Sequence, residues 1–90
     1  MGERINWKEA IMNEMKEQNE TWDIDIVSHT LTTEELLERF NSGFGGSEGC
    51  PFTLWTKKRV YFPVVYDGAE WVDSVPRDPC EEKTRHIGGE

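Results

Sequence analysis

The dipeptide Asp67-Gly68 constrains the fold of this chain more than any other sequence feature. It lies between two runs rich in valine, tyrosine and tryptophan, which are residue types that favour β-strands. Asp-Gly is a preferred pair for a two-residue type I′ turn, so the pattern predicts a β-hairpin closed at these two residues. In this hairpin Tyr66 pairs with Ala69, and the ladder continues in the same register to Phe62 and Asp73.

A third strand is expected before the hairpin, joined to it through a loop at Lys57-Lys58. This loop pairs Leu54 with Tyr61 and places Phe52 opposite Pro63. Proline has no N–H to donate, and in this register Pro63 faces Val72 at a non-hydrogen-bonded position, where the missing donor costs nothing. Residues 50–80 are therefore predicted to form a three-stranded antiparallel meander.

Both faces of the predicted meander are apolar, whereas a sheet with one face in water would alternate apolar with polar residues. One face carries Trp55, Val60, Phe62, Val64, Tyr66 and Trp71, and the other carries Phe52, Leu54, Tyr61, Pro63, Val65 and Val72. Two short helices can cover only one of these faces. The surplus apolar face predicts an interaction surface or a homodimer through the sheet, with the aromatic side chains Trp55, Tyr61, Tyr66 and Trp71 as the contact residues.

Two helices are predicted in the first half of the chain. Asn6 and Glu9 have the spacing of a capping box, and an apolar stripe follows, which indicates a helix over residues 7–19. Thr32 and Glu35 form a second capping box, which predicts a helix over residues 33–42 that ends at Gly43. Their apolar side chains are expected to cover one face of the meander: Trp7, Ile11, Leu36 and Phe40.

Three other segments complete the domain. Residues 22–27 alternate apolar with acidic side chains, which fits a short strand but leaves a short helix open. The four glycines of residues 42–49 predict a tight connector rather than a phosphate-binding loop, because no strand precedes them and no Lys-Ser or Lys-Thr follows. We expect one α+β domain over residues 1–81, with two helices packed on the three-stranded antiparallel meander, and a polar, frayed tail over residues 82–90.

The net charge of −8 is concentrated in the first half of the chain. Residues 1–50 carry 11 acidic and 4 basic side chains (−7), and residues 51–90 carry 7 and 6 (−1). Phosphate contacts need clustered lysine and arginine, so the balance argues against nucleic acid and anionic membranes as direct partners. The chain has no run of 18 apolar residues and no apolar signal-peptide region, so a cytoplasmic location and reduced cysteines are expected.

Sequence patterns for catalysis and for metal binding are missing. Cys50, Cys80, His29 and His86 contain no C-x-x-C or H-x₃-H pair, which structural zinc sites usually show. Cys50 and Cys80 flank the meander, so a disulfide is geometrically conceivable, although two separate thiols are expected. No nucleophile has a base at a recognisable spacing. The sequence predicts no enzymatic activity, no metal and no cofactor.

Charged residues form two further groups. The cations Lys57, Lys58 and Arg59 are expected to be exposed at a hairpin tip, where they aid solubility. The acidic side chains are either a solvated face or a surface that imitates a nucleic-acid backbone and occupies a basic groove of another protein. This acidic face comprises Asp23, Asp25, Glu34, Glu35 and Glu38.

Residues 43–80 contain the strings GGSEGCPFTLWT, VYFPVVYDGAEWV and VPRDP. This stretch resembles small uncharacterised proteins of tailed phages and prophages. The resemblance implies an accessory gene whose product often acts on a host protein, and it carries no activity or catalytic residue. The prediction is a non-enzymatic, acidic protein-binding module that modulates or inhibits a host protein. The alternative is a small-ligand-binding domain that uses the aromatic face with the glycine-rich connector as its lid.

Overall fold

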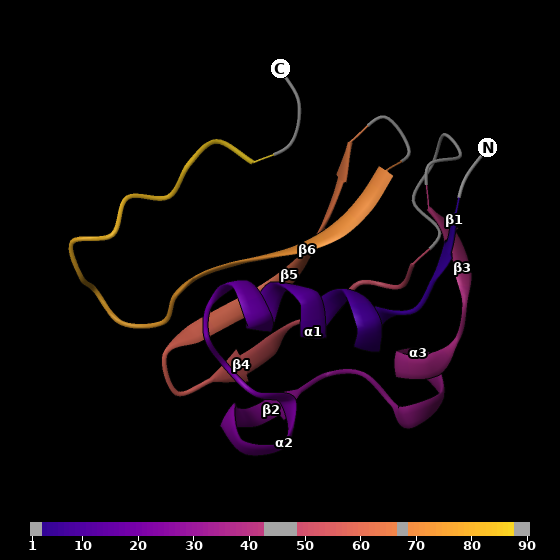
Figure 1. Ribbon diagram of the computed structural model, residues 1–90, viewed down its shortest axis with the longest axis horizontal. Coiled ribbons are helices and arrows are strands. Elements are labelled where there is room, and N and C mark those ends of the chain that lie inside the picture. Colours follow the sequence, from indigo (N-terminus) through magenta and orange to yellow (C-terminus); the bar gives the residue numbers. More distant parts are fainter. Residues whose placement is uncertain (1–2, 43–48, 67–68, 88–90) are drawn as a thin grey trace.

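The computed structural model describes residues 3–42, 49–66 and 69–87. These residues form an α+β domain around a four-stranded antiparallel sheet in the order β2-β4-β5-β6 (Figure 1). A two-stranded sheet, β1 with β3, lies beside it. The strands within these ranges are β1 (Glu3–Ile5), β2 (Ile26–His29), β3 (Phe40–Ser42), β4 (Leu54–Thr56), β5 (Arg59–Tyr66) and β6 (Ala69–Pro76).

The predicted meander is confirmed in β4, β5 and β6. Tyr66 pairs with Ala69, and the ladder continues to Phe62 with Asp73, as the Asp-Gly signal predicts. Pro63 faces Val72, where no N–H is needed from it. Residues 67 and 68 themselves lie outside the described residues. In the other ladder Leu54 pairs with Tyr61 as expected, but β4 begins at Leu54, so the predicted pairing of residue 52 with Pro63 does not form.

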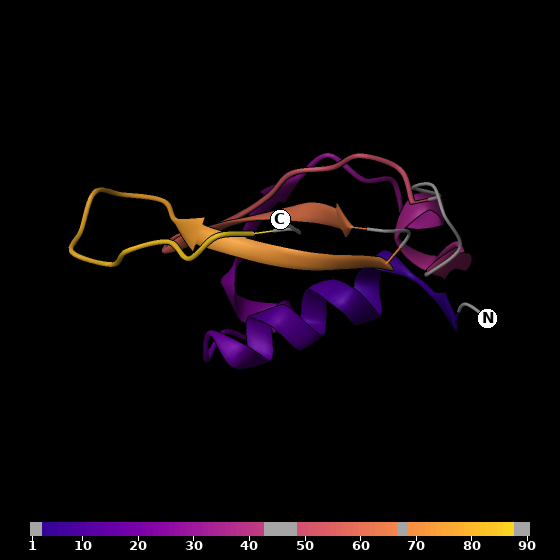
Figure 2. The ribbon, with the colours of Figure 1, turned by 90° about the horizontal axis from the view of Figure 1, so that it is seen from above.

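Helix α1 (Trp7–Glu17) confirms the first predicted helix. The Asn6 side chain accepts a hydrogen bond from the Glu9 backbone N–H at 2.8 Å, which caps the helix. Trp7, Ile11 and Met15 are buried on one side of the helix. Figure 2 shows α1 against one side of β5 and β6, and no helix of the described residues lies over the other side of these two strands. No helix in the described ranges has the length and hydrophobicity needed to cross a membrane.

The second predicted helix is correct at its start and wrong at its end. Helix α3 (Thr33–Leu37) has the expected capping box between Thr32 and Glu35, but Glu38 is already extended. The chain then forms β3, which pairs with β1. Phe40 is buried as predicted, but it reaches the core from β3 and packs against Trp7, with ring centroids 4.8 Å apart. The predicted helix end before Gly43 is also wrong, because α3 ends at Leu37, five residues before the predicted last helical residue.

The segment at residues 22–27 contains both of the alternatives that the sequence left open. Helix α2 (Trp22–Asp25) is a single turn in which the Asp25 side chain accepts from the Thr21 N–H. Strand β2 follows at Ile26 and pairs with β4, with an irregularity between Ile26 and Ser28. The sheet therefore has four strands: the three of the predicted meander and β2, which forms in the region where a further short strand was expected as one alternative.

The core lies between α1 and one face of the sheet. Trp7 is 1% exposed, contacts Phe40 and Phe52, and donates its indole N–H to the Cys50 carbonyl oxygen at 3.0 Å. Gly49 packs so closely against this cluster that a Cβ atom there would overlap the rings of Trp7 and Phe40. The end of the glycine-rich connector is thus fixed to the core at Gly49. Residues 43–48 lie outside the described residues.

Candidate functional site

The face of the sheet turned away from α1 is the main candidate site. It carries Trp55, Val60, Phe62, Val64, Trp71 and Val75, all half-buried, and Tyr66, which is 49% exposed. We call this surface the open face. Its members are in register across β4, β5 and β6: Trp55 pairs with Val60, and Val64 pairs with Trp71. Not one of these apolar side chains is fully buried.

The opposite face is covered by α1 and is buried. Leu54 and Tyr61 have no exposed surface, and Val72 is 4% exposed. The sheet contacts α1 mainly through β6. Strand alternation places these residues on the side opposite to Trp55 and Trp71. The sequence thus correctly predicts two apolar faces of which the helices cover one.

Tyr61 does not belong to the open face, so its prediction as a contact residue conflicts with its position. Its hydroxyl donates to the Glu20 carboxylate inside the core. Burial and this hydrogen bond raise the pKa of Tyr61 well above its ordinary value. Glu20 also accepts from the Thr56 hydroxyl at 3.1 Å. Tyr61 is therefore a structural anchor.

Arg59 is also placed differently from the prediction. Lys57 and Lys58 are exposed at the hairpin tip, but Arg59 is only 9% exposed. Its guanidinium donates to the Ser74 hydroxyl at 2.8 Å and forms a bidentate ion pair with Glu82, with both N–O distances at 3.0 Å. The hydrogen bond with Glu82 raises the pKa of Arg59 and lowers the pKa of Glu82. Alternation along β5 could have revealed this, because Arg59 shares a face with Tyr61.

The C-terminal tail is attached to the sheet at two points. Glu82 binds Arg59, and Arg85 donates to Asp73 at 2.9 Å. Both sheet partners are largely buried, whereas the Glu82 side chain is 45% exposed and that of Arg85 is 73% exposed. The tail curves out past the end of β6 and turns back above it without joining the sheet (Figure 1). The predicted domain boundary between residues 81 and 82 stays a prediction, but Glu82 and Arg85 have defined contacts.

The five predicted acidic residues fall into two places rather than one. Asp23 and Asp25 belong to α2, and Glu34, Glu35 and Glu38 lie in or next to α3. Figure 1 shows α2 and α3 apart along the lower side of the molecule. The carboxylates of Asp25 and Glu35 accept local backbone N–H groups, whereas Asp23, Glu34 and Glu38 are exposed.

Cavities in the described part of the molecule lie away from the centre of the open face. The largest, about 620 Å³, lies between α1 and β6 and is lined by several carboxylates. A polar cavity of about 440 Å³ lies between the tail and β6, and an apolar one of about 250 Å³ lies near Gly49 and Pro51. Among the described residues, none of these three cavities lies at the centre of the open face.

The residues considered for chemistry are not assembled into a reactive group. Cys50 and Cys80 are separate thiols, and burial together with Glu35 raises the pKa of Cys50, which keeps it protonated. His29 Nδ1 accepts the Leu31 N–H at 3.2 Å. Within residues 3–42, 49–66 and 69–87, no three histidine, cysteine or acidic side chains lie together as metal ligands would.

Comparison with protein-family models, with curated proteins and with solved structures finds no match to this chain.

Proposed function

We propose that the protein is a non-enzymatic binding module that holds another protein against its open face. The observation that carries this proposal is the aligned, half-buried set of Trp55, Phe62, Val64 and Trp71, with no helix over it (Figure 2). Large apolar patches on a monomer usually mark interaction sites, and tryptophan and tyrosine are enriched among the residues that dominate binding energy.

The shape of the open face favours a protein over a small ligand. Small-molecule sites are concave and typically enclose roughly 300–1,000 Å³. The apolar cavity near Gly49 and Pro51 is about 250 Å³ and lies beside the face, not at its centre. A small-ligand-binding domain remains the alternative proposal. Its expected lid, the glycine-rich connector, falls mostly on residues outside the described ranges.

The charge of the chain favours a different protein over a second copy. Two copies joined through the sheet would bring together two chains of net charge −8, and like charges oppose such contacts. A partner with a basic rim around an apolar centre would instead be attracted from a distance. The net charge and the resemblance to phage proteins together support a cytoplasmic host protein as the partner. The module would modulate or inhibit this host protein.

A more specific form of the proposal is that the acidic side chains imitate a nucleic acid and bind a basic groove of the partner. Asp23, Glu34 and Glu38 are exposed acidic side chains that could contact a basic groove. Screening distinguishes this mode from aromatic contact, because the Debye length falls from about 10 Å at 0.1 M salt to about 3 Å at 1 M. Binding by mimicry should weaken steeply as salt rises, whereas binding through Trp55 and Trp71 should hardly change.

An affinity-capture experiment with matched variants tests the proposal. The wild-type protein, a Trp55→Thr/Trp71→Thr variant and a Met12→Gln/Leu37→Gln control are each used to capture proteins from a bacterial lysate. Met12 and Leu37 are exposed apolar residues outside the sheet, so the control also removes two exposed apolar side chains. We expect a specific partner with the wild type and the control, and its loss with the tryptophan variant. An unchanged set of captured proteins would contradict the proposal.

A further inference from the structure

The outer edge of β6 is divided into a closed half and an open half. β6 is an edge strand of the sheet formed by the described residues. Because Tyr66 and Ala69 form the closing pair of a two-residue hairpin, alternate residues of β6 bond to β5. The backbone groups of Glu70, Val72 and Ser74 therefore point outward, away from β5.

The half of the edge at Ser74 is closed. The Ser74 N–H donates to the Asp73 carboxylate at 3.0 Å, and its carbonyl oxygen accepts from Arg59 at 3.1 Å. Glu82 and Arg85 of the tail lie over the same region. A further strand cannot bond to β6 at this point, because the Ser74 N–H and carbonyl oxygen already have hydrogen-bond partners.

The half of the edge at Val72 is open. The Val72 N–H and carbonyl oxygen point away from β5, and neither forms a hydrogen bond with the described part of the chain. A residue of an added antiparallel strand can form two backbone hydrogen bonds with such a residue. Edge strands with unpaired backbone groups are templates for strand addition.

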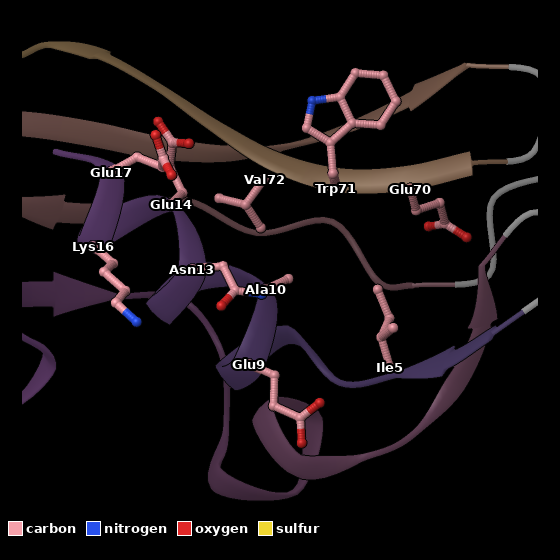
Figure 3. A pocket seen from close by; sticks show the side chains of 10 residues that line it. All are labelled: Ile5, Glu9, Ala10, Asn13, Glu14, Lys16, Glu17, Glu70, Trp71 and Val72. Atoms are coloured by element: carbon pink, nitrogen blue, oxygen red, sulfur yellow. The ribbon is translucent and has the colours of Figure 1, made fainter.

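The open half of the edge borders the groove of about 620 Å³ between α1 and β6. Figure 3 shows the Val72 side chain turned towards α1, where Ala10 lies, and Ile5 at the far end of the groove. These three residues and Trp71 are the apolar residues of its lining. The ring of Trp71 points to the other side of β6, into the open face (Figure 3).

Carboxylates dominate the charged part of the lining. It contains one ammonium group, Lys16, and four carboxylates: Glu9, Glu14, Glu17 and Glu70. Glu9 is paired with Arg39 at 2.9 Å, and Glu14 accepts from Gln18 and Ser74. Glu70 is buried and accepts from the Gly49 N–H at 3.0 Å. Glu17 is exposed and has no hydrogen bond or ion pair to the described residues. Glu17 is thus the carboxylate best placed to meet a cation from outside.

We propose that this groove binds an extended segment of another protein, rich in lysine and arginine, which adds to β6 as a further strand. Alternate side chains of a strand point to opposite sides, so cationic residues of the added strand can face α1, where Glu14 and Glu17 lie on the same side as Ala10 and Val72. The residues between them then point to the side of Trp71. The tail limits the added strand to the part of β6 before Asp73. A second copy of this acidic chain is a poor occupant because its charge matches that of the groove.

This inference goes beyond the proposed function and does not depend on it. The open face and the groove lie on different sides of β6; the added strand would lie beside Trp71 but would not reach Trp55 on β4. A partner could use one surface without the other. The experiment below therefore probes the groove alone.

The probe is the peptide acetyl-Lys-Val-Lys-Val-Lys-Val-Lys-amide, titrated into ¹⁵N-labelled protein and followed by NMR. We expect the Val72 amide proton to shift downfield and its hydrogen exchange to slow by about tenfold or more in the complex. Trp71 bonds to β5 already, so its amide is an internal reference. Failure of the peptide to bind, or binding that leaves the Val72 amide unchanged, would overturn the proposal.

A matched pair of variants tests the charge recognition without endangering the fold. Glu17→Lys reverses an exposed charge in the groove, and Asp23→Lys reverses an exposed charge on α2, next to the opposite edge of the sheet. We expect Glu17→Lys to weaken binding of the peptide by about tenfold, and Asp23→Lys to change it by less than about twofold. An equal loss in both variants would mean a non-specific attraction and would overturn the proposal.

Peptide N-methylation tests whether the occupant is a strand. Two probe peptides are made with N-methyl groups on alternate residues, one on the odd and one on the even positions. Because alternate N–H groups of a strand point to the same neighbour, one of the two peptides should lose binding by about tenfold and the other should retain most of it. Equal binding by both methylated peptides would exclude strand addition.

Discussion

The two faces of the same three strands differ in what covers them. On the side of α1, Leu54, Tyr61 and Val72 are at most 4% exposed, whereas Trp55, Phe62 and Trp71 on the other side are half-buried. Both faces are similarly apolar, so composition does not explain the difference. Helix α1 has 11 residues and covers one face. The covered face therefore forms the core, and the aromatic side chains of the open face stay half-buried in the described part of the chain.

The largest effect is expected from Trp7→Ala, which removes the centre of the covered side. Trp7 is 1% exposed and packs against Phe40 and Phe52. Truncation of such a side chain should lower the free energy of unfolding by about 3–5 kcal/mol, as measured by urea denaturation. A loss below about 1 kcal/mol would show that α1 does not stabilise the sheet in this way.

Tyr61→Phe tests the polar anchor of the covered face. Loss of the hydrogen bond to the Glu20 carboxylate should cost about 1.5–3 kcal/mol at neutral pH. The folded-state pKa of Tyr61 is raised above the unfolded value of about 10, so its contribution is complete below pH 10 and is lost as pH rises beyond it. Wild-type stability should therefore fall more steeply above pH 10 than that of the variant. Parallel pH profiles would contradict this account.

Gly49→Ala tests how tightly the connector is packed on the covered side. The added methyl group overlaps the rings of Trp7 and Phe40, so one of them must move. Overpacking of this kind should cost about 1–3 kcal/mol in thermal or chemical unfolding. A variant that is as stable as the wild type would show that the rings can move apart freely.

Trp71→Thr on the open face should have a small effect on stability, about 1 kcal/mol or less, because threonine also favours strands. Its effect should appear in partner binding instead. Comparison with Trp7→Ala by urea denaturation gives the contrast between the faces directly. A stability loss as large as that of Trp7→Ala would remove the distinction between the two faces.

The smallest effect is expected in the tail. The tail is attached to Arg59 on the covered face and to Asp73 beside the open face. Arg59 lowers the pKa of Glu82, so this attachment is present above the ordinary glutamate pKa of about 4.3 and weakens as pH falls below it. Glu82→Gln should release residues 82–87 at neutral pH, detected as faster amide exchange there. Unchanged exchange would show that the ion pair does not hold the tail.

The parts of the fold that follow from local signals were predictable from the sequence. The Asp-Gly turn sets the β5–β6 register, and the capping residues Asn6 and Thr32 mark both helix starts. The end of α3 was not predictable, because Leu36, Leu37 and Phe40 have helical spacing. The partner of Phe40 in β1 is Ile5, 35 residues earlier, and no local signal marks that pairing.

The same distinction applies to the candidate site. The open face could be predicted because strand alternation assigns Trp55 and Trp71 to one side once the register is known. The position of Arg59 was missed because its partner Glu82 lies 23 residues further along, in a segment without regular secondary structure. The groove beside β6 was missed as well, because it depends on how α1 crosses the sheet.

Site-specific photo-crosslinking tests the central claim most directly. Benzoylphenylalanine is introduced at Trp55 or Trp71 on the open face, and at Met12 on the exposed side of α1 as the control. After irradiation in bacterial cells that produce the protein, adducts are identified by mass spectrometry. The account predicts that both open-face positions yield an adduct with one and the same other protein, and that Met12 does not. Adducts with a second copy of this chain, or no adduct from either open-face position, would contradict it.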